Sequence, residues 1–221
     1  MKGLVLKDLY GVKFQIFGAF LIMLLPIVIM VFGERPAVGS MSGIAFLPNG
    51  LLNYVVITTC SSFLLNTLGF DERSGWAKTQ RTMPLSGGKI IGAKFITMGL
   101  VLAALTLIFL AANVFGVFVH GLPPEPAVAV PVCLCMVQAM ALSPTFALGY
   151  RFGARTTSAA YIGFVVALAA ALIWLLLMIF GGDIGIAALR IIAYVGLPVL
   201  TAAVIAVSWV TGKRAAMESD I

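Results

Sequence analysis

Apolar and polar residues follow one another along this chain in long blocks, and the apolar blocks have the length of membrane-spanning helices. Six uncharged apolar runs occupy residues 14–32, 44–68, 95–119, 127–149, 157–180 and 191–210. A helix needs about 20 such residues to cross the hydrocarbon core of a bilayer. The pattern therefore predicts an all-α integral membrane protein with six transmembrane helices in a single domain, residues 1–221.

The first polar block, residues 1–13, mixes Leu4, Leu6 and Leu9 with Lys7 and Asp8. This mixture is typical of an amphipathic helix that lies in the headgroup plane before the chain enters the membrane. A frayed polar tail is the alternative.

The longest polar block, residues 70–94, separates the second run from the third. Its acids precede its bases, which suits the dipole of a short helix over residues 71–83, weakened at Gly75 and ended by Pro84. A solvated loop with an interfacial Trp76 is the alternative. Ser86 is expected to begin the helix of the third span, and Lys89 and Lys94 are expected to extend to the lipid headgroups.

Basic residues are distributed unevenly between the two sides that six spans define. Arg35 and Arg190 fall on one side. The other twelve fall on the side of the termini: Lys2, Lys7, Lys13, Arg73, Lys78, Arg81, Lys89, Lys94, Arg151, Arg155, Lys213 and Arg214. By the positive-inside rule, both termini and the 71–83 segment are expected to be cytoplasmic.

The composition is that of a membrane protein and argues against a nucleic-acid partner. Hydrophobic residues make up 62% and charged residues 10% of the chain, and the mean hydropathy is +1.12. The net charge of +6 is therefore a marker of membrane topology, and no nucleic-acid partner is expected.

Catalytic and metal-binding groups are sparse in the sequence. His120 is the single histidine, and Cys60, Cys133 and Cys135 lie inside apolar runs, so we expect structural roles for them. Ser86 to Lys89 lacks the spacing of a phosphate-binding loop. We expect no enzyme activity, no metal and no cofactor bound by this chain.

The second run is unusually polar. Asn53, Thr58, Ser62 and Asn66 recur at intervals of five, four and four residues, close to one face of a helix. Such a face either packs against neighbouring helices or lines a pathway, and the sequence leaves both interpretations open.

Three short motifs resemble those of ABC-2-type permeases, the membrane subunits of bacterial ATP-binding-cassette exporters. They are Leu4-Val5-Leu6-Lys7-Asp8-Leu9, Asp71-Glu72-Arg73-Ser74-Gly75-Trp76 and Met83-Pro84-Leu85-Ser86. In size and pattern the chain is most similar to the permeases that export phenol-soluble modulins, which are amphipathic peptides.

The resemblance implies a type V (ABCG-like) exporter fold in the plasma membrane of a bacterium or archaeon. It further implies a second permease copy, identical or closely related, and a separate cytoplasmic ATPase that holds ATP and magnesium. Residues 1–13 become a connecting helix, and residues 71–83 become a coupling helix. The residues implied to contact the ATPase are Asp71, Glu72, Arg73, Trp76, Lys78, Arg81, Met83, Arg151 and Arg155.

The expected function is export of an amphipathic peptide or another hydrophobic compound, driven by the partner ATPase. An ion-coupled carrier or channel is one alternative, although no ionisable residue lies at the centre of a predicted span. A non-transporting immunity or scaffold protein of the membrane is the other.

Overall fold

The structure, a computed structural model, describes residues 2–11, 13–14, 17–18, 21–22, 24, 28, 57–58, 62, 64–71, 73–76, 79, 86–120, 124–180 and 191–218. Within these ranges all regular secondary structure is helical. The elements are α1 (Lys2–Gly11), α5 (Gly87–His120), α6 (Pro124–Phe152), α7 (Ala154–Phe180), η1 (Ile192–Gly196) and α9 (Leu197–Glu218). Most of the first two predicted spans lies outside the described residues.

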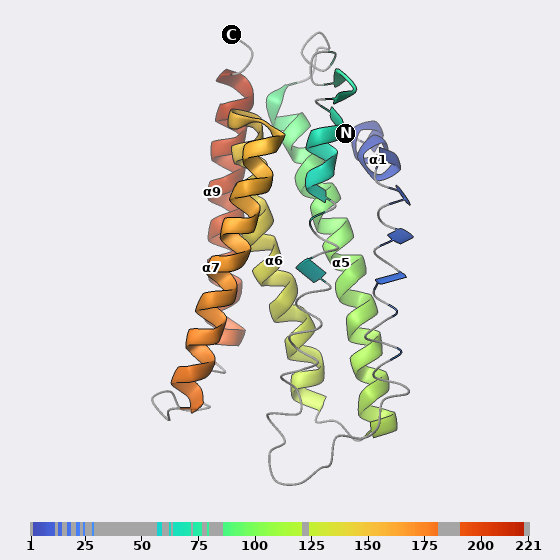
Figure 1. The fold of residues 1–221 in the computed structure, drawn as a ribbon, viewed down its shortest axis with the longest axis vertical. Coiled ribbons are helices and arrows are strands. Elements are labelled where there is room, and N and C mark those ends of the chain that lie inside the picture. Colours follow the sequence, from blue (N-terminus) through green and yellow to red (C-terminus); the bar gives the residue numbers. More distant parts are fainter. Residues whose placement is uncertain are drawn as a thin grey trace.

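The four long helices run side by side along the long axis of the molecule (Figure 1). α6 packs against α5, α7 and α9 and so occupies the middle of the bundle. α1 is viewed nearly along its own axis in Figure 1, so it crosses the direction of the bundle beside α5. Whether α1 lies in the headgroup plane stays a prediction.

Three helical stretches of the described chain are long and apolar enough to cross a membrane: Gly87–Phe118, Ala127–Phe152 and Ile192–Ala216. They correspond to the third, fourth and sixth predicted spans. α7 covers the fifth predicted span and begins three residues before it, at Ala154. The total of six transmembrane helices stays a prediction.

The ends of α5, α6 and α7 follow from polar and glycine residues. α5 begins directly after Ser86, whose carbonyl accepts a hydrogen bond from the Lys89 amide at 2.8 Å. α6 and α7 are separated at Gly153, which has a φ of 86°. Glycine adopts this left-handed conformation without the steric cost of a Cβ atom, so the chain can turn there within one residue.

Aromatic side chains join three helices in the core. The ring of Phe95 on α5 lies 6.4 Å from that of Phe146 on α6 and 5.5 Å, edge to face, from that of Trp209 on α9. Phe109, Phe146 and Leu142 are almost completely buried. Tilted aromatic pairs at these separations add to the stability that burial alone provides.

The last span begins with one turn of π-helix. The Leu197 amide donates its hydrogen bond to the Ile192 carbonyl, one residue further back than in an α-helix. Pro198 follows directly, and a proline ring clashes with the carbonyl four residues earlier, here that of Tyr194. The wider turn is therefore a local response of the backbone to Pro198.

The two ends of the bundle differ in charge. We name as the basic end the one where α1, the start of α5, the α6–α7 junction and the end of α9 meet (Figure 1). It carries the described basic residues Lys2, Lys7, Lys13, Arg73, Lys89, Lys94, Arg151, Arg155, Lys213 and Arg214. That this end faces the cytoplasm stays a prediction from the positive-inside rule. The opposite end, with Pro124 and Ile191, is the outer end.

Candidate functional site

Four charged side chains form a buried ionic cluster at the basic end. The Lys94 ammonium on α5 lies 2.8 Å from Oδ1 of Asp8 on α1 and 2.7 Å from Oδ2 of Asp71. Lys7 contacts the other oxygen of Asp71, and its Nζ lies 3.2 Å from Asp8. We call Lys7, Asp8, Asp71 and Lys94 the ionic cluster. It connects α1, the helical residues 64–71 and α5, which are distant in sequence.

Burial makes the ionic cluster energetically important. The side chains of Lys94 and Asp8 are each 3% exposed, that of Asp71 is 7% exposed, and that of Lys7 is 24% exposed. Two ammonium groups balance two carboxylates, so no net charge is buried. Removal of one member of such a set leaves an uncompensated buried charge, which is strongly destabilising.

The position of Asp71 explains why cations gather there. It lies in a helical segment whose described residues are 64–71 and 73, shortly before a chain turn at Ser74 and Gly75. The C-terminal end of a helix carries partial negative charge, which disfavours a carboxylate. Lys7 and Lys94 offset both this dipole and the carboxylate.

The predicted helix over residues 71–83 is interrupted in the structure. The Ser74 amide donates to the Phe70 carbonyl at 2.9 Å, and Gly75 has a φ of 69°. This is a helix ending in a left-handed glycine, and helical structure resumes at Trp76. The chain therefore changes direction within the segment, where the sequence predicted only a weak point.

Trp76 lies directly beside the ionic cluster. The Lys7 ammonium is 4.9 Å from the centroid of the indole ring, a cation–π contact. The indole Nε1 atom is buried, and within the described chain it has no hydrogen-bond acceptor. A buried donor without an acceptor is rare in proteins, which distinguishes Trp76 from the other described residues of this segment.

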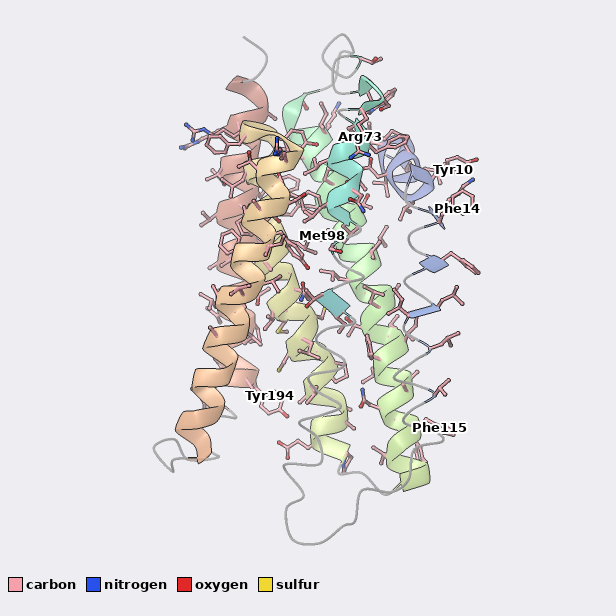
Figure 2. All side chains as sticks on the ribbon, in the orientation of Figure 1. Tyr10, Phe14, Arg73, Met98, Phe115 and Tyr194 are labelled. Carbon is pink, nitrogen blue, oxygen red and sulfur yellow. The ribbon has the colours of Figure 1, made fainter. Side chains whose placement is uncertain are left out.

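The other residues predicted to contact an ATPase are partly described. Arg73, Arg151 and Arg155 are exposed at the basic end, and Figure 2 labels Arg73 beside α1. The Arg151 guanidinium lies 5.4 Å from the Phe152 ring. Asp71 faces inward, in the ionic cluster. Glu72, Lys78, Arg81 and Met83 lie outside the described residues.

Thr58, on the polar face of the second span, takes part in a hydrogen-bond network. Gln138 of α6 donates to the Thr58 hydroxyl at 2.5 Å. The Tyr161 hydroxyl of α7 lies 3.0 Å from the Thr58 carbonyl and 3.1 Å from Oε1 of Gln138. At Thr58 this polar face therefore joins helices. Ser62 is half-buried, Asn66 is exposed, and Asn53 lies outside the described residues.

The expectation for Lys94 is wrong. Its side chain does not extend to the headgroups but is buried between two carboxylates, whereas Lys89, one and a half turns earlier, is exposed as expected. Lys7, Asp8 and Lys94 were not among the predicted site residues. The available signal was the presence of two acids, Asp8 and Asp71, at the edges of apolar segments where bases predominate.

Comparison with known proteins identifies the family. The model of the family described as ABC-2 family transporter protein matches residues 3–212, almost the whole chain. No curated protein and no solved structure gives a significant match. The chain therefore belongs to the ABC-2 family of transporter proteins, and its role is in transport across a membrane.

Proposed function

We propose that this chain is the permease subunit of an ATP-driven exporter in a bacterial or archaeal plasma membrane. Two copies, identical or closely related, form the pathway, and a separate cytoplasmic ATPase binds ATP and magnesium. The substrate is an amphipathic peptide, of the class exported by phenol-soluble modulin permeases, or another hydrophobic compound. The membership of the ABC-2 family supports the transport role, since permeases of this family generally pair with an ATPase.

The ionic cluster is the observation that carries the proposal. Asp71 stands at the start of the 71–83 segment, and its carboxylate is tied through Lys94 to α5 and through Lys7 to α1. A displacement of this segment is therefore transmitted to the helix that follows it and to the helix that precedes the first span. Such a rigid connection is what a coupling element requires.

In the proposed cycle, the ATPase moves the 71–83 segment when its two copies close on ATP. α5 and α1 move with that segment, and the spans change which side of the membrane has access to the pathway. A ligand shifts a conformational equilibrium only by as much as its contacts differ between the two states. Arg73, Trp76, Arg151 and Arg155, with Glu72, Lys78, Arg81 and Met83, are the proposed ATPase contacts.

The polar face of the second span is proposed to line part of the pathway. Asn53, Ser62 and Asn66 are its candidates, and Thr58 fixes this face against α6 and α7 through Gln138. Scattered amide and hydroxyl groups among apolar side chains suit a substrate with both polar and apolar faces.

Trp76→Ala and Arg73→Glu test the coupling role. Both variants are expected to insert normally into the membrane. They are expected to lower substrate-stimulated ATP hydrolysis of the co-expressed complex about three- to tenfold, which corresponds to a loss of about 0.7–1.4 kcal/mol of coupling free energy. ATP hydrolysis and substrate uptake into inverted vesicles are measured side by side.

The matched control is Arg214→Glu, which reverses an exposed charge at the same end of the bundle but on α9, outside the 71–83 segment. Its ATP hydrolysis is expected to stay near that of the wild type. Unchanged hydrolysis and transport in both test variants contradict the coupling role, and transport without any ATPase contradicts the exporter proposal itself.

A further inference from the structure

A pocket opens at the outer end of the bundle, between the first turns of α6 and the beginning of the last span. Its volume is about 490 Å³. Cavities of about 300–1,000 Å³ accommodate small-molecule ligands. Tyr194, on the π-helical turn, borders the pocket and marks its place in Figure 2.

The walls of the pocket belong to two helical stretches that are long and apolar enough to cross a membrane. Cys133 lies within Ala127–Phe152, and Ala193 lies within Ile192–Ala216. Inside the membrane a protein is surrounded by hydrocarbon and not by water. A molecule that enters this part of the pocket from outside the protein therefore comes from the bilayer.

The pocket is long and narrow. Its α6 lining extends from Glu125 to Met136, over which an α-helix rises about 16 Å, at about 1.5 Å per residue. A volume of about 490 Å³ over this length corresponds to a mean cross-section of about 30 Å². An α-helix with its side chains is about 10–12 Å wide, which corresponds to about 80–110 Å². The pocket therefore has the width for one extended hydrocarbon chain, whereas a helix of a second copy or a helical peptide is too wide.

The lining changes from polar to apolar along this length. At the outer end, the exposed side chains of Tyr194 and Glu125 are joined by a 3.4 Å hydrogen bond from hydroxyl to carboxylate. Further along α6, the lining residues Val132, Cys133 and Met136 are half-buried and apolar. Tyrosine is enriched where a protein meets the membrane–water interface. The order matches that of a lipid, with its polar head group at the interface and its acyl chain directed toward the middle of the membrane.

Small side chains keep the pocket open. α6 contributes Ala129 and Cys133 to the walls, and the opposite side contributes Ala193 and Pro198. Large apolar side chains at these positions would close the gap between the two helices. The walls of an unfilled hollow lose dispersion contacts on one side. A flexible hydrocarbon chain restores these contacts, and it requires no polar partner within the pocket.

We propose that this pocket holds one acyl chain of a phospholipid from the leaflet at the outer end. The chain lies along α6 from the Tyr194 end toward Met136, and the head group stays outside the pocket, at the interface. Recognition rests on the width and the length of the apolar channel. The bound chain fills the gap between α6 and the last span, and its binding needs neither ATP nor an ATPase.

Native mass spectrometry of the purified chain measures whether a lipid is retained. After transfer from phosphatidylcholine nanodiscs into detergent, the chain is expected to keep one phosphatidylcholine when the surrounding lipid has been removed. Ala129→Phe fills the channel from α6 and Ala193→Phe fills it from the opposite wall, and each is expected to lower the retained fraction at least fivefold. Val199→Phe, at an exposed apolar position of α9, is the matched control and is expected to retain lipid as the wild type does.

Photochemical labelling of the wild type shows where the acyl chain lies. A phosphatidylcholine with a diazirine in the middle of one acyl chain is expected to label Cys133 and its lining neighbours Val132 and Met136. Labelling of Cys133 is expected to exceed that of Cys135 at least fivefold. Cys135 is an internal control two residues away, because its Sγ atom lies 4.0 Å from the Leu102 carbonyl on α5 and it is not part of the pocket lining.

A chain that keeps no lipid in detergent overturns the proposal, and so does equal retention in the wild type and a folded Ala129→Phe or Ala193→Phe protein. Lipid-free masses of two chains that are lost in Ala129→Phe would assign the pocket to a contact between copies, which overturns it as well. If neither filled variant folds, equal labelling of Cys133 and Cys135 in the wild type still decides against it. Because no ATPase or nucleotide is present, these outcomes are independent of the coupling experiment.

Discussion

At the basic end, buried charged side chains join three helical segments, whereas at the outer end the exposed Glu125 is among the described lining residues of an apolar pocket between the first turns of α6 and the start of the last span. The charges of the ionic cluster are buried and mutually compensated, so each depends on the others. Glu125 is exposed, and its carboxylate accepts a 3.4 Å hydrogen bond from the Tyr194 hydroxyl.

The difference shows two uses of charge in one membrane protein. Compensated buried charges hold three helical segments in fixed positions at the basic end. An exposed carboxylate such as that of Glu125 does not depend in this way on a buried partner. Substitutions of charged residues should therefore lower the stability more at the basic end than at the outer end.

The largest effect is expected from Lys94→Met, which leaves Asp8 and Asp71 with only Lys7 as a partner. Loss of one partner from a buried ion pair costs about 3–5 kcal/mol. Thermal unfolding in detergent measures this loss. Lys89→Met, at an exposed position of the same helix, is the control and should change the stability by less than about 0.5 kcal/mol. Equal stabilities of the two variants contradict the structural role of the ionic cluster.

A smaller loss is expected from Gly149→Ala, which tests how closely the helices approach near the basic end. An added Cβ atom would lie 2.6 Å from Cδ1 of Leu68 and 2.7 Å from Oγ1 of Thr157. Overpacking of this kind costs about 1–3 kcal/mol in the free energy of unfolding. At Gly163, on α7, an added Cβ atom meets nothing within 4 Å. Gly163→Ala should therefore raise the free energy of unfolding by up to about 1 kcal/mol. Thermal unfolding in detergent compares the two variants, and a Gly149→Ala protein as stable as Gly163→Ala would contradict the close approach of the helices.

The smallest effect is expected in the middle of the bundle, from Gln138→Leu. Hydrogen bonds between membrane helices contribute about 0.6–2 kcal/mol each. A double-mutant cycle of Gln138→Leu with Tyr161→Phe should give a coupling energy of at least about 0.5 kcal/mol, because the two side chains lie 3.1 Å apart. Additive losses would show that the network does not act as a unit.

Hydropathy alone predicted the helices of the bundle but not what connects them. The third, fourth and sixth apolar runs fall within described membrane-length helices, because the cost of exposing apolar side chains to water determines such segments. The helices extend beyond these runs, to Gly87 at one end of α5 and to Phe152 at one end of α6, because polar residues at a membrane surface remain helical.

The candidate site could be predicted less completely from the sequence than the helices. Lys94 pairs with residues 86 and 23 positions away, and a sequence pattern does not reveal whether a lysine near the interface reaches headgroups or carboxylates. Asp71 and Trp76 were predicted as functional residues, yet their burial beside Lys7 depends on the packing of α1. The outer pocket was not predicted, since it depends on one irregular turn.

That irregular turn has a consequence for sequence variation. A π-turn holds one residue more than the α-helical turn it replaces, and one residue corresponds to about 100° of rotation around a helix. Deleting a single residue between Ile191 and Leu197 would turn the preceding part of the chain by that angle and carry the Tyr194 side chain away from Glu125. Relatives that lack one residue here, or that have another residue in place of Pro198, should therefore keep the membrane helix but lose the hollow beside it.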